Sequence, residues 1–146
     1  MIGNKAAGKK QFLTSSNAIK SIDTSRTKKN DFFEWYESDE AVYLKPDQRL
    51  VFQEVSAADS LLWDTMVAEV IRSRPRKPFA GCLFFTDLEF LIISEEEQID
   101  YALTALIDRI TSICDQTNTA LPVYMVVSKL DKLQGFKEYV QLSPLK

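Results

Sequence analysis

The first residues that could do chemistry form the stretch Gly3-Asn4-Lys5-Ala6-Ala7-Gly8-Lys9-Lys10. Its spacing is that of a phosphate-binding loop, G-x-x-x-x-G-K-[ST], except at the last position. In that motif the glycines let successive backbone N–H groups point at a phosphate, and the lysine reaches the terminal phosphates. The helix that follows adds the partial positive charge of its N-terminus. Gly3, Gly8 and Lys9 therefore predict an anion-binding loop.

The last position of this loop departs from the motif. Lys10 stands where a serine or threonine hydroxyl would bind Mg²⁺. An ammonium group cannot ligate Mg²⁺ and repels it, because both carry positive charge. We therefore interpret the loop as an anion site that lacks one ligand of a normal magnesium–nucleotide site.

The composition narrows the chemistry further. The chain has 146 residues, 45% of them hydrophobic and 27% charged, which is enough for one α/β domain with a core. It contains no histidine, so Ser-His and Cys-His nucleophile systems and histidine-bound metals are excluded. Cys82 and Cys114 lie in apolar surroundings, which favours buried free thiols over a disulfide or a metal site. The net charge of -3 points to no particular partner.

The sequence shows neither a membrane span nor a secretory signal. No run approaches the ~18 apolar residues of a span, and the start lacks the apolar stretch of a signal peptide. A phosphate-binding loop normally follows a buried strand, yet only Met1 and Ile2 precede Gly3. We therefore expect a fragment that lacks its first strand.

The first 30 residues are rich in positive charge. They carry seven basic side chains against one acid, Asp23. We expect a short helix over about residues 9–17 and then a polar loop to residue 30. A solvated segment is the favoured interpretation. The functional alternatives are contact with nucleic acid or with anionic lipid. Interleaved aromatic residues would better support nucleic-acid binding, and only Phe12 is available.

A β-hairpin is predicted next in the chain. Residues 32–36 are an aromatic-rich strand, Asp39-Glu40 is a tight turn, and residues 41–44 are the second strand. Residues 49–52 are expected to follow as an extended piece or a short strand.

Two long helices then alternate with two apolar strands. Ser56 and Ser94 can cap the helices, and the unbroken apolar runs suit strands that are covered by helices on both faces. The expected elements are a helix over 57–73, a strand over 79–85, a helix over about 94–116, a strand over 122–127 and a short helix over about 133–141.

This alternation predicts an α/β fold with a mostly parallel sheet and helices on both faces. Binding crevices in such sheets lie beyond the carboxyl ends of the strands. Two loops would converge there, the loop at 3–10 and the loop after Val127. The second loop reads Ser128-Lys129-Leu130-Asp131 and resembles the [NT]-K-x-D motif of GTPases. In that motif the aspartate accepts two hydrogen bonds from guanine, and the lysine stem packs on the ring.

These features make the chain resemble the N-terminal cytoplasmic GTPase-like domain of the IcmF/TssM proteins, inner-membrane components of bacterial type VI and Dot/Icm type IV secretion systems. The resemblance covers nearly the whole chain and includes the patterns W-[YF]-x-x-[DE]-E-A-V-x-L and L-P-V-Y-x-[VL]-x-[ST]-K-x-D-x-L-x-G-F. It implies a P-loop NTPase-like fold. The segments that carry it are Gly3–Lys9 and residues 35–44, 74–81 and 121–136.

The departures from the family pattern concern magnesium. Members with an intact site continue from E-A-V-x-L into D-T-A-G-R, where this chain reads Lys45-Pro46-Asp47-Gln48-Arg49. Lys45 replaces the Mg²⁺-associated acid, and Gln48 replaces the glycine whose N–H would sense a γ-phosphate. Asp47 lies two places late and is not expected to substitute. Together with Lys10, two Mg²⁺-linked positions hold lysine, so the charge on a transferred phosphoryl group would not be neutralised.

The expected function follows from these departures. We expect a single degenerate GTPase-like domain over 1–146, a non-hydrolysing pseudo-GTPase that serves as an interaction scaffold, with no catalytic residue and no metal site. Binding of GTP or GDP without magnesium stays open as an expectation. The residues that would bind the nucleotide are Gly3, Gly8, Lys9, Ser128, Lys129 and Asp131.

Several alternatives and partners accompany this expectation. An active domain that binds or hydrolyses GTP or ATP to regulate secretion would need Asp87 and Glu89 as replacement ligands, although turn-forming and capping roles are favoured for them. Lys10 and Lys45 could instead pair with Asp47 or Asp131 and close the crevice. The resemblance implies a DotU/TssL-type inner-membrane partner and other secretion components, at the cytoplasmic face of the bacterial inner membrane. It places the membrane anchor outside this sequence.

Overall fold

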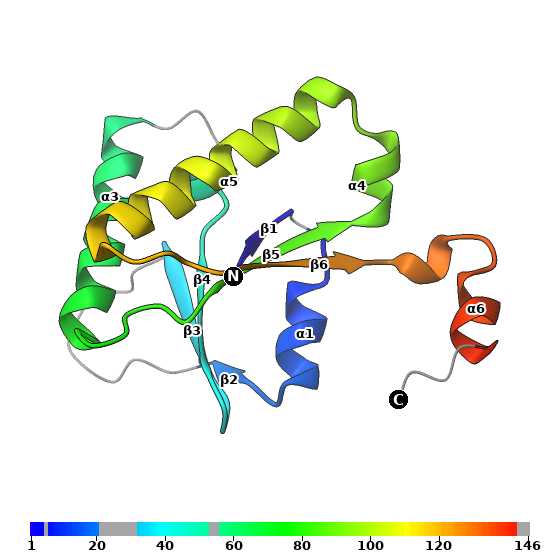
Figure 1. The fold of residues 1–146 in the computed structure, drawn as a ribbon, viewed down its shortest axis with the longest axis horizontal. Helices are drawn as coiled ribbons and strands as arrows, with labels where there is room; N and C mark the ends of the chain where they lie inside the picture. The colour runs from blue at the N-terminus through cyan, green and yellow to red at the C-terminus, as the bar shows by residue number, and fades with distance from the viewer. Residues whose placement is uncertain (5, 21–31, 53–55, 143–146) are drawn as a thin grey trace.

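The computed structural model describes residues 1–4, 6–20, 32–52 and 56–142. They form an α/β fold with two three-stranded sheets (Figure 1). One sheet is parallel, with the strand order β1-β5-β6; the other is antiparallel, with the order β2-β3-β4. The strands are β1 (Ile2–Gly3), β2 (Ile19–Lys20), β3 (Phe33–Glu37), β4 (Val42–Pro46), β5 (Cys82–Asp87) and β6 (Val123–Ser128).

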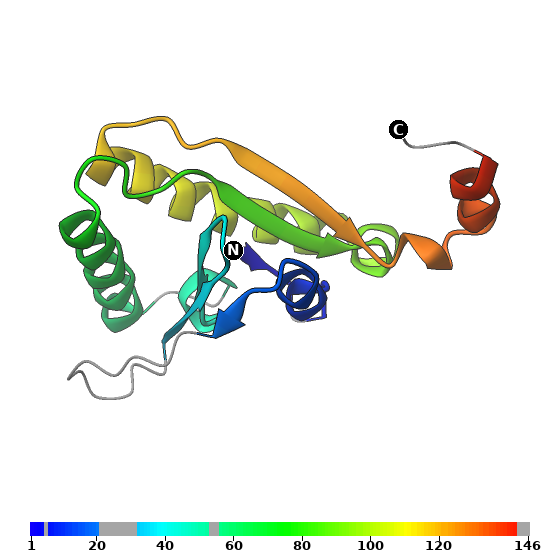
Figure 2. The ribbon, with the colours of Figure 1, turned by 90° about the horizontal axis from the view of Figure 1, so that it is seen from below.

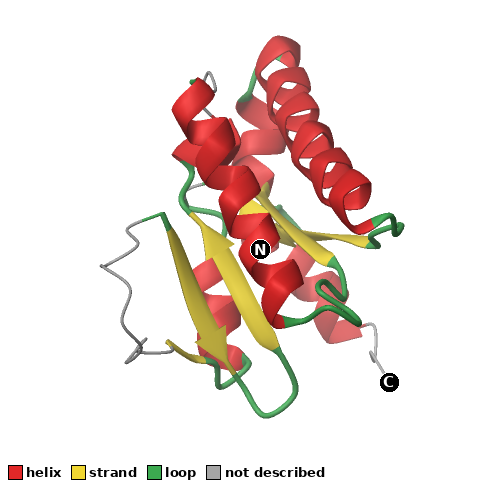
Figure 3. Ribbon diagram, turned by 90° about the vertical axis from the view of Figure 1, so that its left-hand side faces the viewer, coloured by secondary structure: helices red, strands yellow, loops and turns green. Residues whose placement is uncertain are grey.

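Helices surround the parallel sheet, and Figure 3 shows the two sheets as separate groups of strands. The short α6 and the long α3 lie at opposite ends of the molecule (Figure 2). The helices are α1 (Lys9–Ser15), α2 (Arg49–Phe52), α3 (Ala57–Ser73), α4 (Leu88–Ile93), α5 (Glu96–Thr117), the 3₁₀ turn η1 (Leu130–Lys132) and α6 (Phe136–Leu142).

Strand β5 lies at the centre of the parallel sheet, and its side chains alternate between the two faces, as strand geometry requires. Phe84 belongs to the main core together with Trp63 of α3 and Leu106 of α5. The next residue, Phe85, packs edge-on against Phe12 of α1, with ring centroids 5.3 Å apart. Helices thus cover both faces of β5, which confirms that part of the fold prediction.

The predicted hairpin and the long helices are confirmed with small changes of boundary. Strands β3 and β4 pair as expected, and α3 begins after Ser56, whose hydroxyl accepts a hydrogen bond from the Asp59 N–H at 3.2 Å. Ser94, in contrast, ends α4, and the N-cap residue of α5 is Glu95. The predicted cap at Ser94 was therefore wrong, because the apolar residues before it form a separate short helix.

Residues 49–52 are helical, so the predicted extended piece or short strand was wrong. Leu50 and Val51 are both buried in the core. Consecutive residues of a strand would point to opposite faces, whereas a helical turn can pack both against α3 and α5. The Asp47 carboxylate accepts a hydrogen bond from the Arg49 N–H at 3.0 Å at the start of this turn.

The glycine loop begins in β1, a strand of two residues that includes Gly3 itself. The expectation of a fragment that lacks its first strand stays a prediction. Ile2 and Gly3 pair in parallel with Phe84 and Phe85. The amino group of Met1 donates a hydrogen bond to the Leu44 carbonyl at 2.7 Å. This contact ties the edge of the parallel sheet to β4 of the antiparallel sheet.

Strand β6 differs from the prediction in its burial. It pairs with β5, and within the described residues no strand pairs with its other edge. Val123, Tyr124 and Met125 are exposed, so its first half is not covered on both faces. Both cysteines are free thiols; Cys82 is buried, as expected, whereas Cys114 is only half-buried. Among the described residues, no helix has the length and apolar content needed to cross a membrane.

Candidate functional site

The glycine loop between β1 and α1 has the backbone conformation that its sequence predicts. Gly3 has φ +147° and Gly8 has φ +78°, both in the region that favours glycine. A Cβ at Gly3 would lie 2.0 Å from the Phe85 carbonyl oxygen, so only glycine fits beside β5. Gly8 is the N-cap residue of α1. The two glycines therefore shape a tight turn at the carboxyl end of β1.

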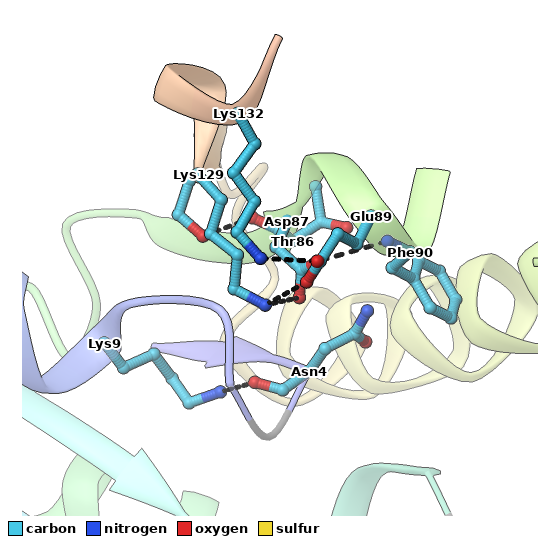
Figure 4. A network of polar contacts seen from close by, with 9 residues as sticks. Asn4, Lys9, Thr86, Asp87, Glu89, Phe90, Lys129 and Lys132 are labelled. Atoms are coloured by element: carbon cyan, nitrogen blue, oxygen red, sulfur yellow. Dashed lines mark hydrogen bonds and ion pairs between the residues drawn. The ribbon is translucent and has the colours of Figure 1, made fainter. Parts of the chain in front are cut away.

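The lysine of this loop is folded back onto its own backbone (Figure 4). Its Nζ donates hydrogen bonds to the Gly3 carbonyl at 2.6 Å and to the Asn4 carbonyl at 2.5 Å. Burial, and then the positive charge of Lys45, lower the pKa of Lys9 to about 8. An anion bound by Lys9 would have to compete with these two carbonyl groups.

The second motif meets the first, as the sequence predicts. Ser128 ends β6, and a Cβ placed on Gly8 would lie 3.2 Å from the Ser128 Cβ. The Ser128 hydroxyl donates a hydrogen bond to the Thr86 carbonyl at 3.3 Å. The loops after β1 and β6 thus lie together at the carboxyl ends of the parallel strands.

Lys129 follows in a left-handed conformation, with φ +59°. Its Nζ lies 2.8 Å from a carboxylate oxygen of Glu89 and 3.5 Å from one of Asp87 (Figure 4). Lys132 binds the other oxygen of Glu89 at 2.5 Å. Hydrogen bonds to the two lysines lower the pKa of Glu89 to about 2. Asp131, the acid of the predicted guanine motif, is exposed in η1.

The two acids after β5 now have defined roles. Asp87 caps α4, because its carboxylate accepts a hydrogen bond from the Phe90 N–H at 3.0 Å, and this confirms the capping interpretation. Glu89 was considered from the sequence as a magnesium ligand or a capping residue, but its ion pairs with Lys129 and Lys132 were not predicted. Opposite charges just after two neighbouring strands were the signal that could have indicated them.

The three departures from the motif lie apart from one another. Lys10 is exposed in the first turn of α1. Lys45 forms an ion pair with Glu34 across the hairpin at 2.5 Å. The Gln48 Nε2 donates a hydrogen bond to the Gly3 carbonyl at 3.4 Å.

The proposed pairing of Lys10 and Lys45 with Asp47 or Asp131 was wrong. Asp47 pairs instead with Arg49 at 3.5 Å, and Lys45 with Glu34. Within the described ranges, no three His, Cys, Asp or Glu side chains gather in a way that could hold a metal ion. The Asn4 Nδ2 and the Thr86 Oγ1 are buried polar atoms that find no hydrogen-bond partner among the described residues.

Comparisons with known proteins can now be set beside this geometry. A family model described as the IcmF-related N-terminal domain matches residues 56–145. The chain belongs to this family. The match covers α3 to α6 and the loop after β6, whereas the glycine loop lies outside it.

A curated relative supports the same family. The chain is 26% identical over 107 residues to the type VI secretion system component TssM1 of Pseudomonas aeruginosa. The aligned part is 73% of this chain but 10% of that relative, so the chain spans a small part of the relative's length. No solved structure gives a significant match.

Proposed function

We propose that this domain is a non-hydrolysing, GTPase-like interaction scaffold of a bacterial secretion machine. The observation that carries the proposal is the state of the two Mg²⁺-linked positions. Lys10 is exposed and Lys45 is paired with Glu34, so neither position offers an oxygen ligand to the ion. Phosphoryl transfer without Mg²⁺ leaves the charge of the transferred group without its main counterion.

The state of the motif lysines supports the same proposal. Lys9 is engaged by two backbone carbonyls, and Lys129 by Glu89 and Asp87. Each lysine would have to leave its partners before it could bind a phosphate or pack on a base. A scaffold does not need these residues to be free, whereas an active nucleotide site does.

The proposed setting comes from the family. A secretion component related to TssM1 would use this domain at the cytoplasmic face of the inner membrane, in a type VI or Dot/Icm type IV machine. Its partners there would be a DotU/TssL-type inner-membrane protein and other components of the machine.

Nucleotide binding is the second candidate function, and one observation favours it. The glycine loop and the loop after β6 touch at Gly8 and Ser128, which is the arrangement that a nucleotide spanning both loops requires. Under this alternative the domain binds GTP or GDP without magnesium, or hydrolyses GTP or ATP to regulate secretion.

Phosphate release from GTP in the presence of Mg²⁺ tests the proposal directly. We expect the full chain to release phosphate at the same rate as the Lys9→Ala variant and as buffer alone. Turnover above background that depends on Mg²⁺ and is lost in Lys9→Ala would overturn the scaffold proposal in favour of an active NTPase.

A further inference from the structure

The corner between α4 and α5 exposes an unusual run of apolar side chains. Leu91 is 38% exposed, Ile92 64% and Ile93 77%, and they follow one another in the chain. Single exposed apolar residues are normal on protein surfaces, whereas contiguous exposed apolar patches are typical of surfaces that bind another molecule. We call this corner, residues 90–101, the α4–α5 corner.

The same corner carries negative charge without a basic side chain beside it in the sequence. Residues 90–101 contain four acids and no basic residue. In the part of the chain that the structure describes, none of the four forms an ion pair, whereas the nearby Glu89 is neutralised by two lysines. The four acids are Glu95, Glu96, Glu97 and Asp100.

A cavity of about 730 Å³ opens beside these residues. One side is built by Asn4, Gln48 and Phe52, and the other by α4 and α5, including Phe90, Glu97 and Tyr101. The Tyr101 hydroxyl donates a hydrogen bond to the Phe52 carbonyl at 2.9 Å and joins the two sides.

We propose that the α4–α5 corner is the docking site for a basic, apolar peptide segment of a partner protein. This inference rests on the proposed scaffold function and names the surface that would perform it. The apolar residues of the segment would cover Ile92 and Ile93. One of its arginines would enter the cavity toward Glu97, because a guanidinium group matches a carboxylate with paired hydrogen bonds.

Charge and hydrogen bonding together select this occupant. The acids of the corner repel nucleic acid and anionic lipid surfaces, so neither is the partner. A free cation would satisfy Glu97 but would leave the apolar side chains of Ile92 and Ile93 exposed. A peptide supplies both groups, since its arginine donates hydrogen bonds and its apolar side chains cover these residues.

The test uses two fluorescent peptides with the same leucine pattern, one with arginine and one with glutamate at its polar positions. Fluorescence anisotropy with the full chain should show that the arginine peptide binds at least about tenfold more tightly. Glu97→Gln and Ile93→Ser should each weaken this binding about fivefold or more. Glu138→Gln, which removes an exposed acid on α6, is the matched control and should leave it unchanged.

Several results would overturn the inference. One such result is that the arginine peptide does not bind. Another is that Glu138→Gln weakens peptide binding as much as Glu97→Gln does, which would indicate general charge attraction. If sedimentation shows that the wild-type chain is a dimer and that Ile93→Ser is a monomer, the corner binds a second copy of the chain. Binding of phosphatidylserine vesicles that Ile93→Ser abolishes would assign it to a membrane.

Failure of this inference can be told apart from failure of the scaffold proposal. GTP turnover would overturn the scaffold proposal and says nothing of the corner. If the chain shows no GTP turnover and does not bind the arginine peptide, the proposal for the α4–α5 corner fails and the scaffold proposal stands. Ile93 and Glu97 are exposed, so both variants should fold, which circular dichroism would check.

Discussion

Lys9 satisfies its hydrogen bonds within its own loop. Two carbonyl oxygens accept from its Nζ, and burial lowers its pKa from 10.5 to about 8. The unfolded chain therefore binds this proton more strongly than the folded chain does. Lys9 is thus a residue whose positive charge lowers the free energy of unfolding at neutral pH.

This pKa leads to a prediction about stability. Between about pH 8 and pH 10.5, Lys9 has lost its proton in the folded state but keeps it in the unfolded state. The free energy of unfolding should therefore increase with pH over this range. Urea unfolding across this pH range should show this increase in the wild type and in Lys10→Met, where an exposed lysine is removed. In Lys9→Met this increase should be missing. An increase of the same size in Lys9→Met would show that Lys9 is not its source.

Gly3 gives a second prediction at the scale of a single residue. A Cβ there would meet the Phe85 carbonyl at 2.0 Å, so Gly3→Ala should cost about 3 kcal/mol or more of stability. Gly135 also has positive φ, +82°, but has open space around it. Gly135→Ala should therefore cost only about 1 kcal/mol. Chemical denaturation compares the two, and equal losses would contradict the close packing of β1 on β5.

At the scale of elements, ion pairs connect helix α4, which follows β5, to the loop that follows β6. Glu89 of α4 holds Lys129 and Lys132, which follow β6. The register of the parallel pair, Asp87 opposite Ser128, brings these groups together. The sequence alone could not supply that register, because it does not say which residues of two strands lie opposite each other.

Glu89 makes a prediction for the acid range. Its pKa falls from 4.5 in the unfolded chain to about 2, so its contribution to stability is present above pH 4.5 and is lost as the pH falls toward 2. Glu89→Gln should reduce the loss of stability over this range, as seen by thermal unfolding at stepped pH. Glu138→Gln is the control and should keep the wild-type profile; an unchanged profile in Glu89→Gln would contradict the network.

Helix caps give a further prediction. Ser56→Ala removes the side-chain acceptor at the start of α3 and should cost about 1 kcal/mol. Ser94→Ala is the matched change, since Ser94 ends α4 and caps no helix with its side chain. Denaturant midpoints should fall in the first variant and stay near the wild type in the second. The reverse order would mean that the helix boundaries are misplaced.

At the scale of the whole molecule, the sequence predicted the class of fold and the meeting of the two loops. The apolar runs identified β5 and β6, and the helical spacing identified α3 and α5. It could not predict that Val123 and Met125 are exposed, because an apolar run shows that residues avoid water but not what covers them. The helical turn at Leu50 was missed for a similar reason, since four residues are too few to show a period.

The family match supports our proposal that this domain belongs to a component of a secretion machine, and the contacts of the motif lysines indicate how it would differ from an enzyme. Lys45 and Lys129 are paired with Glu34 and Glu89, and Lys9 is hydrogen-bonded to backbone carbonyls, so charge that could serve a nucleotide serves the fold. The surface at the α4–α5 corner remains for a partner. The central claim is therefore that the crevice has lost its use of magnesium.

Titration calorimetry with GTP, with and without Mg²⁺, tests that claim most directly. We expect that Mg²⁺ does not strengthen GTP binding, whether the affinity is measurable or absent, because lysines stand at the two positions where the GTPase-like motifs would place its ligands. Asp131→Ala serves as the control for binding through the loop after β6. GTP affinity that rises when Mg²⁺ is added and falls in Asp131→Ala would contradict the account.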